Sequence, residues 1–368
     1  MFSEEQDELR GMLRDFFSRK SPTDEVRRLM DSDLGYDPVL WKQMGEELGL
    51  QGIAIPEEFG GSGYSFAEVL IVLEEMGRRL VCAPYFSTVV LAAHAILCSG
   101  DDAAKRRYLP RIADGSLVST VALTEPDGRW DQAGICATAT DSGAGWTISG
   151  VKSYVLDGYV ADLVLVAARG ERGVSLFAVP GDAPGLTKSL LSTLDQTRKQ
   201  AQLKFSNTPA TLVGAEGQGW AILEQVLDFA AIGLATEQVG GAQSVLDMSV
   251  QFAKERIQYG RPIGSFQAIK HKCADMLLQL ESARSAAYFA SWCAGALSDD
   301  LSRVAAVAKA TCSDAYVNVA TENIQIHGGV GFTWEHPAHL YFRRAKSSEL
   351  LFGDPDYWRE LFLQRTGI

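Results

Sequence analysis

The 368-residue sequence has little of several features that mark specialised protein classes. It carries 34 Lys and Arg against 46 Asp and Glu, for a net charge of −12, and so lacks the basic excess that binding to a phosphate backbone needs. It also has no run of about 20 apolar residues, the length that a membrane-spanning helix requires. We therefore expect neither nucleic acid as a partner nor a membrane span.

Cysteine-based frameworks are missing too. The six cysteines form no CxxC pair and are not accompanied by a histidine pair at the spacing of a zinc framework. This pattern predicts reduced thiols and no metal site. The N-terminus mixes acidic and basic residues and has no long apolar core of the kind found in signal peptides, which favours a cytoplasmic location.

The residues that are present divide the chain into three parts. Apolar residues recur at helical intervals up to about residue 117, and short β-branched segments separated by turn residues fill 118–214. Helical spacing returns over 215–368, where the absence of proline between Gly219 and Pro262 predicts one very long helix. We predict an α+β multidomain fold with a helical domain at 1–117, a β domain at 118–214 and a helical domain at 215–368.

The expected elements follow from these patterns. Strands are predicted at 118–123, 135–140, 146–148, 163–167, 174–179 and 202–205. After the long helix, further helices are predicted at 266–296, 301–326 and 355–365, with the glycines at 328–331 as a break.

Six short motifs occur along the chain in a fixed order. They are PEEFGGSG at 56–63, Thr124-Glu125-Pro126, GWTISGVK at 145–152, KERIQYGRPIG at 254–264, Phe266-Gln267 and QIHGGVGF at 325–332. Each motif is weak by itself. Together, and in this order, they resemble the acyl-CoA dehydrogenase family over essentially the whole chain.

The resemblance implies a function and an assembly. It implies a barrel-like middle β domain and a C-terminal four-helix bundle, with FAD held between these two domains and a neighbouring subunit. Such enzymes are flavoprotein oxidoreductases acting on CH–CH groups in fatty acid or sterol breakdown: a carboxylate removes the α-proton of an acyl-CoA thioester, and the β-hydrogen leaves as hydride to the flavin. An electron-transfer flavoprotein is the expected acceptor, and a homo- or hetero-oligomer is the expected assembly.

The resemblance also assigns the cofactor contacts. Arg256 corresponds to the family arginine that meets the FAD pyrophosphate of the partner subunit, where a guanidinium fork suits phosphate oxygens. Gly328 and Gly329 lack a Cβ and permit a close backbone approach. The full predicted set is Thr124, Tyr154, Arg256, Tyr259, Gln267, Gln325, Gly328 and Gly329.

The sequence departs from the family pattern at the catalytic base. The glutamate usually found near the C-terminus is replaced by Phe352, and the alternative position early in the long helix holds Ala230. Neither side chain can take a proton. The remaining candidates are Glu237, seven residues and roughly 10 Å beyond Ala230 along a helix, and Asp354, with Glu349 behind them.

Three interpretations stay open on the sequence. The chain is an active acyl-CoA dehydrogenase with Glu237 or Asp354 as an unusual base, or it is a catalytically silent subunit paired with a glutamate-bearing relative. The third is a flavin oxidase or monooxygenase on the same fold, which needs no α-proton base. Loss of the base at both Phe352 and Ala230 favours the second or an unusual form of the first. Of the three, the sequence narrowly favours an acyl-CoA dehydrogenase, with the silent subunit and the oxidase as alternatives.

Overall fold

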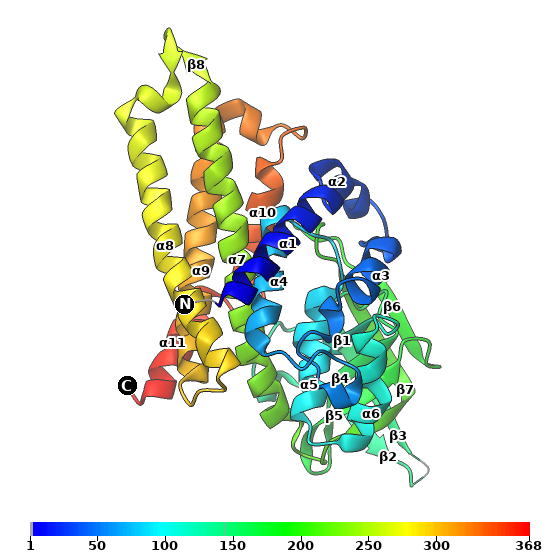
Figure 1. The fold of residues 1–368 in the computed structure, drawn as a ribbon. Helices are drawn as coiled ribbons and strands as arrows, with labels where there is room; N and C mark the ends of the chain where they lie inside the picture. Colours follow the sequence, from blue (N-terminus) through cyan, green and yellow to red (C-terminus); the bar gives the residue numbers. More distant parts are fainter. Residues whose placement is uncertain (1–2, 144) are drawn as a thin grey trace. The chain divides into compact units, whose positions relative to one another are not determined.

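The computed structural model describes residues 3–143 and 145–368 (Figure 1). The described residues form two compact units. The helical unit takes its residues from Met1–Arg27, Phe66–Val81 and Ala231–Ile368, and the β unit consists of Arg28–Ser65 and Cys82–Ala230. The domain boundaries at 117/118 and 214/215 stay a prediction.

The N-terminal third is helical, as predicted. Several of its helices begin at a residue whose side chain accepts a hydrogen bond from a free backbone N–H group of the first turn. Ser3 and Gln6 form a capping box on the first helix, and Asp37 and Asp101 cap two later helices. The helices are α1 (Glu4–Lys20), α2 (Thr23–Met30), α3 (Pro38–Glu46), α4 (Phe66–Arg79), α5 (His94–Cys98) and α6 (Asp102–Ala113), with 3₁₀ turns η1 (Leu50–Gly52) and η2 (Glu57–Phe59) and the π-helical segment η3 (Phe86–Ala93).

Seven strands of the β unit form one sheet. They are β1 (Ser119–Ala122), β2 (Thr138–Asp141), β3 (Trp146–Leu156), β4 (Leu163–Gly170), β5 (Gly173–Pro180), β6 (Leu186–Leu190) and β7 (Gln200–Val213), with a 3₁₀ turn η4 (Gln132–Gly134) before β2. The strand order is β1-β4-β2-β3-β7-β5, and β5 pairs back to β4 while β6 pairs with β7. The strands β4, β2, β3, β7 and β5 therefore close into the predicted barrel.

The interior of the barrel is apolar. Ile148, Val164, Phe177 and Leu203 are completely buried there together with small alanines. Strands β3 and β7 pair antiparallel from Trp146 opposite Ala210 to Leu156 opposite Gln200, with register shifts between Ile148 and Gly150 and between Lys152 and Val155. The second shift spans Ser153 and Tyr154, so the side chains of these two residues depart from the regular alternation of the strand.

The C-terminal part contains the predicted long helix and the bundle around it. Its elements are α7 (Gly219–Glu255), the hairpin β8 (Ile257–Gln258) and β9 (Arg261–Pro262), η5 (Ile263–Ser265), α8 (Gln267–Gly295), α9 (Leu301–His327), η6 (Gly328–Phe332), α10 (Ala338–Leu350) and α11 (Pro355–Thr366). Helix α9 packs against α8, α10 and α11, which gives the predicted four-helix bundle of α7 to α10 with α11 on its side (Figure 1).

Glycines permit close helix crossings inside the helical unit. A Cβ on Gly240 of α7 would lie 1.9 Å from the carbonyl oxygen of Glu74 on α4, and one on Gly77 would lie 2.1 Å from the carbonyl oxygen of Glu237. On another side of α7, a Cβ on Gly241 would meet the Tyr316 ring of α9 at 2.5 Å. Helix α7 is therefore packed tightly against both α4 and α9.

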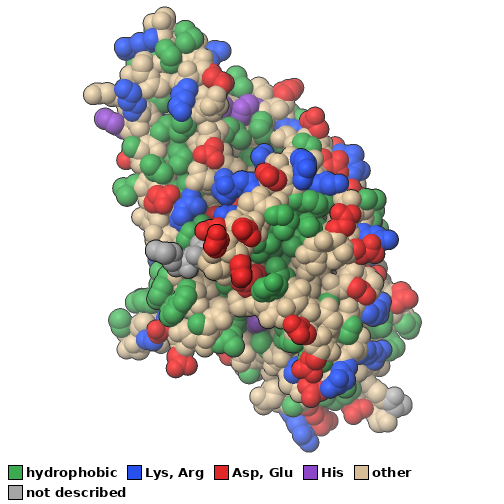
Figure 2. Space-filling model, viewed as in Figure 1, with side chains coloured by type: hydrophobic (Ala, Val, Ile, Leu, Met, Phe, Trp, Pro, Cys, Tyr) green, Lys and Arg blue, Asp and Glu red, His purple; other side chains and the backbone are tan. Residues whose placement is uncertain are grey.

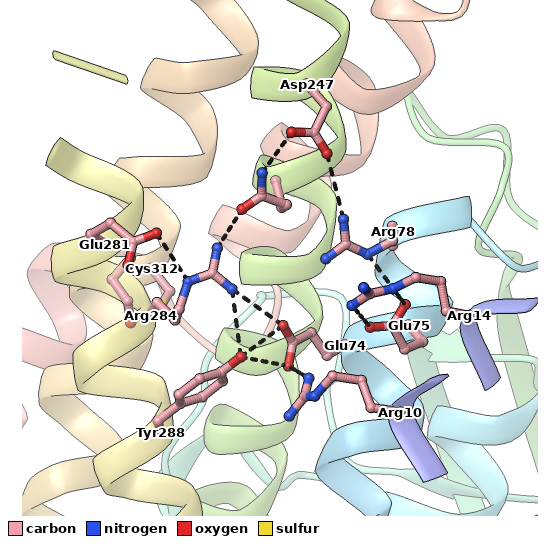
Figure 3. A network of polar contacts seen from close by, with 12 residues as sticks. Arg10, Arg14, Glu74, Glu75, Arg78, Asp247, Glu281, Arg284, Tyr288 and Cys312 are labelled. Atoms are coloured by element: carbon pink, nitrogen blue, oxygen red, sulfur yellow. Dashed lines mark hydrogen bonds and ion pairs between the residues drawn. The ribbon is translucent and has the colours of Figure 1, made fainter. Parts of the chain in front are cut away.

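Buried carboxylates connect the helices that meet at α4 (Figure 3). Glu74 is paired with Arg10 of α1 and Arg284 of α8, and it accepts a hydrogen bond from the Tyr288 hydroxyl at 3.0 Å. Its neighbour Glu75 pairs with Arg14 at 2.8 Å and Arg78 at 3.2 Å. Each buried charge has a hydrogen-bonded counter-ion, as burial in low dielectric requires.

Several elements were not expected from the sequence, among them strand β6 and helix α10. Strand β6 alternates between half-buried and exposed residues at the side of β7, so it has no apolar run to mark it. Helix α10 follows Pro337 and has a mixed polar sequence, and only its packing on α9 covers its apolar side. Helix α7 is long and apolar enough to cross a membrane by length and composition, and 72% of its most apolar stretch is buried within the structure.

Candidate functional site

The strand end after β1 contains a buried ion pair. Glu125 accepts hydrogen bonds through one carboxylate oxygen from Lys152 Nζ at 2.8 Å and from the backbone N–H groups of Cys136 and Ala137 at 2.9 Å each. Lys152 also donates to the Leu123 carbonyl at 3.0 Å. Burial lowers the pKa of Lys152 to about 8, and the facing Glu125 opposes this shift. The pair fixes the backbone on both sides of Thr124.

The structure brings two predicted cofactor residues, Thr124 and Tyr154, to this strand end. The Ser153 N–H donates to the Thr124 carbonyl at 2.9 Å, which places the neighbouring Tyr154 beside it. Tyr154 has a positive φ of 59°, unusual for a side chain of this size, and the residue is 48% exposed. The irregularity in β3 therefore exposes Tyr154 one residue beyond the backbone hydrogen bond between Ser153 and Thr124.

Arg256 and Tyr259 lie at the tip of the helical unit. They belong to the turn that joins α7 to α8, which the β8–β9 hairpin closes and in which Ile263 N–H donates to the Arg256 carbonyl at 2.8 Å. Tyr259 has a positive φ of 53° and is 92% exposed. The exposed Arg256 guanidinium makes no ion pair or side-chain hydrogen bond with any residue in 3–143 or 145–368. An arginine presented in this way is available to an external anion.

The other residues predicted at this end of the bundle come from α8 and from the end of α9. Gln267 is the first residue of α8, next to Phe266, whose ring meets the Tyr259 ring at 6.2 Å. Gln325 is exposed in the last turn of α9, and His327 of that turn stacks on Phe252 of α7 at 4.2 Å. This contact places the end of α9 beside the end of α7, from which the hairpin starts.

The glycine turn after α9 is open to an approaching group. Gly328 has φ +60° and ψ −140°, a conformation that favours glycine. A Cβ added to Gly328 or Gly329 would meet no atom within 4 Å, whereas one on Gly331 would lie 3.0 Å from the His327 Cβ. Gly331 therefore serves packing, while Gly328 and Gly329 leave free space in front of the backbone.

The turn after α10 carries Phe352, which occupies the predicted base position. Phe352 is buried with a positive φ of 62°, and its carbonyl accepts a hydrogen bond from Trp358 Nε1 at 3.0 Å. The following Gly353 has φ +103°, and a Cβ there would collide with the Tyr357 ring at 2.3 Å. Ala230, at the alternative base position, is completely buried within α7. Both positions are apolar.

A fully buried lysine fixes the shape of this turn. Lys309 of α9 donates to the Glu349 and Gly353 carbonyls at 3.0 and 3.1 Å and to the Ser313 hydroxyl at 3.0 Å. Burial lowers the pKa of Lys309 to about 7. No carboxylate lies within ion-pair distance of Lys309 among the residues that the structure describes. The ammonium group instead occupies the C-terminal end of α10, where free carbonyls and the helix dipole favour a cation.

The two predicted bases, Glu237 and Asp354, and the third candidate, Glu349, each bind another group of the chain through their carboxylates. Glu237 is buried and pairs with the buried Arg344 of α10 at 2.6 Å. Asp354 caps α11 by accepting a hydrogen bond from the Tyr357 N–H at 2.8 Å, and Glu349 pairs with Lys346. The structure does not bring Glu237 and Asp354 together with any exposed site residue of the bundle tip.

Sequence reasoning missed the polar residues that shape these segments. The Glu125–Lys152 pair joins positions 27 residues apart, and the Glu237–Arg344 pair joins positions 107 residues apart. Lys309 had a detectable signal: it stands in the alanine-rich segment AAVAKA, and such small neighbours indicate a crowded helix face.

Comparisons with known proteins agree along the whole chain. Models of the acyl-CoA dehydrogenase N-terminal, middle and C-terminal domains match residues 3–116, 120–208 and 217–366. The acyl-CoA dehydrogenase IpdE2 of Mycolicibacterium smegmatis is 35% identical over 353 residues, which cover 96% of each chain.

Two solved structures show the same fold. A variant of the Tcur3481-Tcur3483 steroid ACAD has 33% identity and a TM-score of 0.89, with 99% of this chain and 98% of that chain covered. The ChsE4-ChsE5 complex from Mycobacterium tuberculosis has 27% identity and a TM-score of 0.90, with 100% and 97% covered. The chain belongs to the acyl-CoA dehydrogenase family, the FAD-dependent oxidoreductases that act on the CH–CH groups of acyl-CoA thioesters.

Proposed function

We propose that this chain is the subunit of a heteromeric acyl-CoA dehydrogenase that helps to bind FAD and supplies no catalytic base. The observation that carries this proposal is Phe352, a buried phenyl group in a tightly fixed turn at the position of the family glutamate. A phenyl group cannot accept the α-proton of an acyl-CoA thioester. A glutamate-bearing relative in the same assembly would provide that group.

The environment of the other carboxylates supports the proposal. Using Glu237 as a base would require breaking its buried 2.6 Å pair with Arg344, which costs about 3–5 kcal/mol. Asp354 would have to give up the first-turn N–H that it caps, at a cost of about 1 kcal/mol. Both residues have a structural role that accounts for their presence.

The residues predicted to bind FAD fit such a ligand. Arg256 offers a free guanidinium to phosphate oxygens, Gly328 and Gly329 leave room for a close approach, and the exposed Tyr154 ring can stack on a flat ring system. The remaining proposed contacts are Thr124, Tyr259, Gln267 and Gln325. Bound FAD would supply the acceptor for the substrate hydride, and these residues would bind and orient it.

The similar proteins support a two-component assembly. Two solved structures with the same fold are named as pairs of proteins, Tcur3481-Tcur3483 and ChsE4-ChsE5. We extend the proposal to an acyl-CoA substrate of the fatty acid or sterol type, to an electron-transfer flavoprotein as the acceptor and to a cytoplasmic location.

Co-expression with a glutamate-bearing relative tests the proposal. We expect a mixed oligomer whose acyl-CoA oxidation is lost when the relative's glutamate becomes glutamine, and is retained with Glu237→Gln in this chain. Arg256→Gln should reduce the flavin content of the complex, whereas Arg303→Gln, which changes an exposed arginine on α9, should not. Purification of this chain as an active homo-oligomer would contradict the proposal.

A further inference from the structure

The loop between η6 and α10 carries a tryptophan that is surrounded by cationic and imidazole side chains. The Cζ atoms of Arg27 and Arg343 lie 5.6 and 5.1 Å from the centroid of the Trp334 ring. The His339 ring stacks on the same ring at 4.7 Å. We call these four residues the Trp334 cluster, and all of them belong to the helical unit. Figure 2 shows Lys, Arg and His side chains on the face where α2, α10 and this loop run in Figure 1.

Two buried nitrogen atoms of the cluster have no hydrogen-bond partner among the residues that the structure describes. They are Nη1 of Arg27 and Nδ1 of His339, a residue that is 8% exposed. Arg27 donates through Nη2 to the His336 carbonyl at 3.4 Å, and no carboxylate of residues 3–143 or 145–368 lies within ion-pair distance of it. Because buried polar groups are normally hydrogen-bonded, the two atoms indicate a partner from outside the chain.

The two nitrogen atoms need partners of opposite kinds. His339 Nε2 lies 3.2 Å from the Trp334 carbonyl, and because a carbonyl only accepts, Nε2 carries the proton. Burial lowers the pKa of His339, with the hydrogen bond to Trp334 opposing the shift and the Arg27 and Arg343 cations adding to it. The ring is therefore neutral at neutral pH, and its Nδ1 is an acceptor. The Arg27 Nη1 atom is a donor, so the missing partner both accepts and donates.

The surroundings of these atoms favour a partner with negative charge. Helix α10 begins at Ala338, directly before His339, so the positive end of its dipole lies at the cluster. The rings of His327 and His336 lie 4.5 Å apart beside it, and burial lowers the pKa of each. A water molecule can satisfy a donor and an acceptor, but it leaves the positive charge of Arg27 without a counter-ion. An anion that carries an O–H group provides all three.

We propose that the Trp334 cluster binds a phosphate group that keeps one P–OH, either as free inorganic phosphate or as the end of a phosphate monoester. The phosphate oxygens accept from Arg27 Nη1 in a charge-assisted hydrogen bond, and the P–OH donates to His339 Nδ1. Because both nitrogen atoms are buried, the Trp334 ring, which is 52% exposed, shifts to admit the ligand. This inference concerns a second ligand and does not depend on the proposed function.

Titration calorimetry of the full-length chain with inorganic phosphate and with sulfate tests the proposal. Sulfate has a similar size but no proton to donate to His339, so at pH 7 it should bind at least about 10-fold more weakly than phosphate. Adenosine monophosphate separates the two sources at pH 6, where about half of a phosphate monoester keeps its proton. Tighter binding than that of inorganic phosphate at the same pH would assign the site to a monoester, and equal or weaker binding would assign it to free phosphate.

Three variants assign the binding to this cluster. Arg27→Gln should weaken both anions by at least about 10-fold. In His339→Gln, the amide keeps a donor for the Trp334 carbonyl and lacks Nδ1, so the preference for phosphate over sulfate should disappear while sulfate binding stays unchanged. Arg256→Gln is the control, because Arg256 is the other arginine predicted to meet phosphate oxygens, and it should leave phosphate binding unchanged.

Several results would overturn the proposal. They are the absence of phosphate binding, equal binding of phosphate and sulfate by the unaltered chain, unchanged phosphate binding in Arg27→Gln, and loss of phosphate binding in Arg256→Gln. The ratio of the two affinities in His339→Gln decides the case if Arg27→Gln does not fold. None of these measurements involves catalytic activity.

Discussion

The strand end after β1 and the turn after α10 each contain a fully buried lysine, but the two lysines have different partners. Lys152 faces a carboxylate, Glu125, at 2.8 Å. Among the residues that the structure describes, the acceptors of Lys309 are two carbonyls and a hydroxyl. The pKa is lowered in both cases by burial, to about 8 for Lys152 and about 7 for Lys309, in line with the missing counter-ion at the second site.

Under the proposed function, this difference separates the segment that would bind the cofactor from the turn that would carry the base. The strand end keeps a satisfied polar network beside Thr124 and Tyr154, as a segment that binds a polar cofactor needs. The turn has a fixed backbone shape, held by Lys309 and Trp358, and carries a phenyl group at the predicted base position, where it cannot take a proton. Under the proposed function, the chain keeps the shape of this turn and lacks the base.

Restoring a carboxylate to the turn should have the largest effect. Phe352→Glu in the chain alone should make acyl-CoA bleach the bound flavin at least about 10²–10⁴-fold faster than the unaltered chain, the usual contribution of a positioned general base. Anaerobic stopped-flow absorbance would measure the rate. In the control variant Phe352→Gln, the glutamine has the shape of glutamate but no titratable group, so flavin bleaching should remain slow. Equal bleaching rates for the two variants would show that the turn does not lack a carboxylate.

Removing the counter-ion at the strand end should have the next largest effect. Lys152→Met leaves Glu125 buried without a cation, so the free energy of unfolding should fall by about 3–5 kcal/mol. Urea denaturation would measure the loss. Adding Glu125→Gln to the same chain should recover part of it, because the unpaired charge is then gone.

The corresponding change at the turn should be milder. Lys309→Met leaves carbonyl and hydroxyl acceptors unsatisfied but strands no charge, so we expect a loss of about 1–3 kcal/mol in the same denaturation experiment. A larger loss for Lys309→Met than for Lys152→Met would reverse the comparison between the two sites.

The smallest effect is expected in the pH dependence of stability. The titration of Lys309 should change the free energy of unfolding by at most about 1.4 kcal/mol per pH unit. Because the pKa of Lys309 is about 7 in the folded chain against 10.5 for an ordinary lysine, the unfolded chain binds one more proton between these values. Stability therefore rises with pH in this window. The unfolding free energy of the unaltered chain should increase relative to that of Lys309→Met from pH 7 to pH 9, and a constant difference would show that Lys309 does not titrate there.

Much of the fold could be predicted from local patterns. The proline-free stretch after Gly219 predicted α7, and the β-branched segments predicted six of the seven strands of the sheet. Strand β3 extends well past its predicted end at 148 to Leu156, because Gly150 (φ +149°) sits in a register irregularity and does not end the strand. Strand β6 and helix α10 depend on packing against β7 and α9 for their stability, and a local pattern carries little of that information.

The site could be predicted less completely. The order of the motifs predicted the cofactor residues and the replacement at Phe352, because both predictions depend on sequence position alone, and both stay predictions. The engagement of Glu237 by Arg344 depends on α7 and α10 packing together, 107 residues apart. Because of this contact, Glu237 is part of a buried ion pair, which the sequence pattern alone does not reveal.

The most direct test of the missing base is an anaerobic titration of the purified chain alone with a panel of acyl-CoA thioesters, read from the absorbance band of oxidised flavin. We predict that the bound flavin is not bleached by any thioester until a glutamate-bearing relative is present in the complex. Bleaching of the flavin in the chain alone would show that it carries its own base, and would contradict the account.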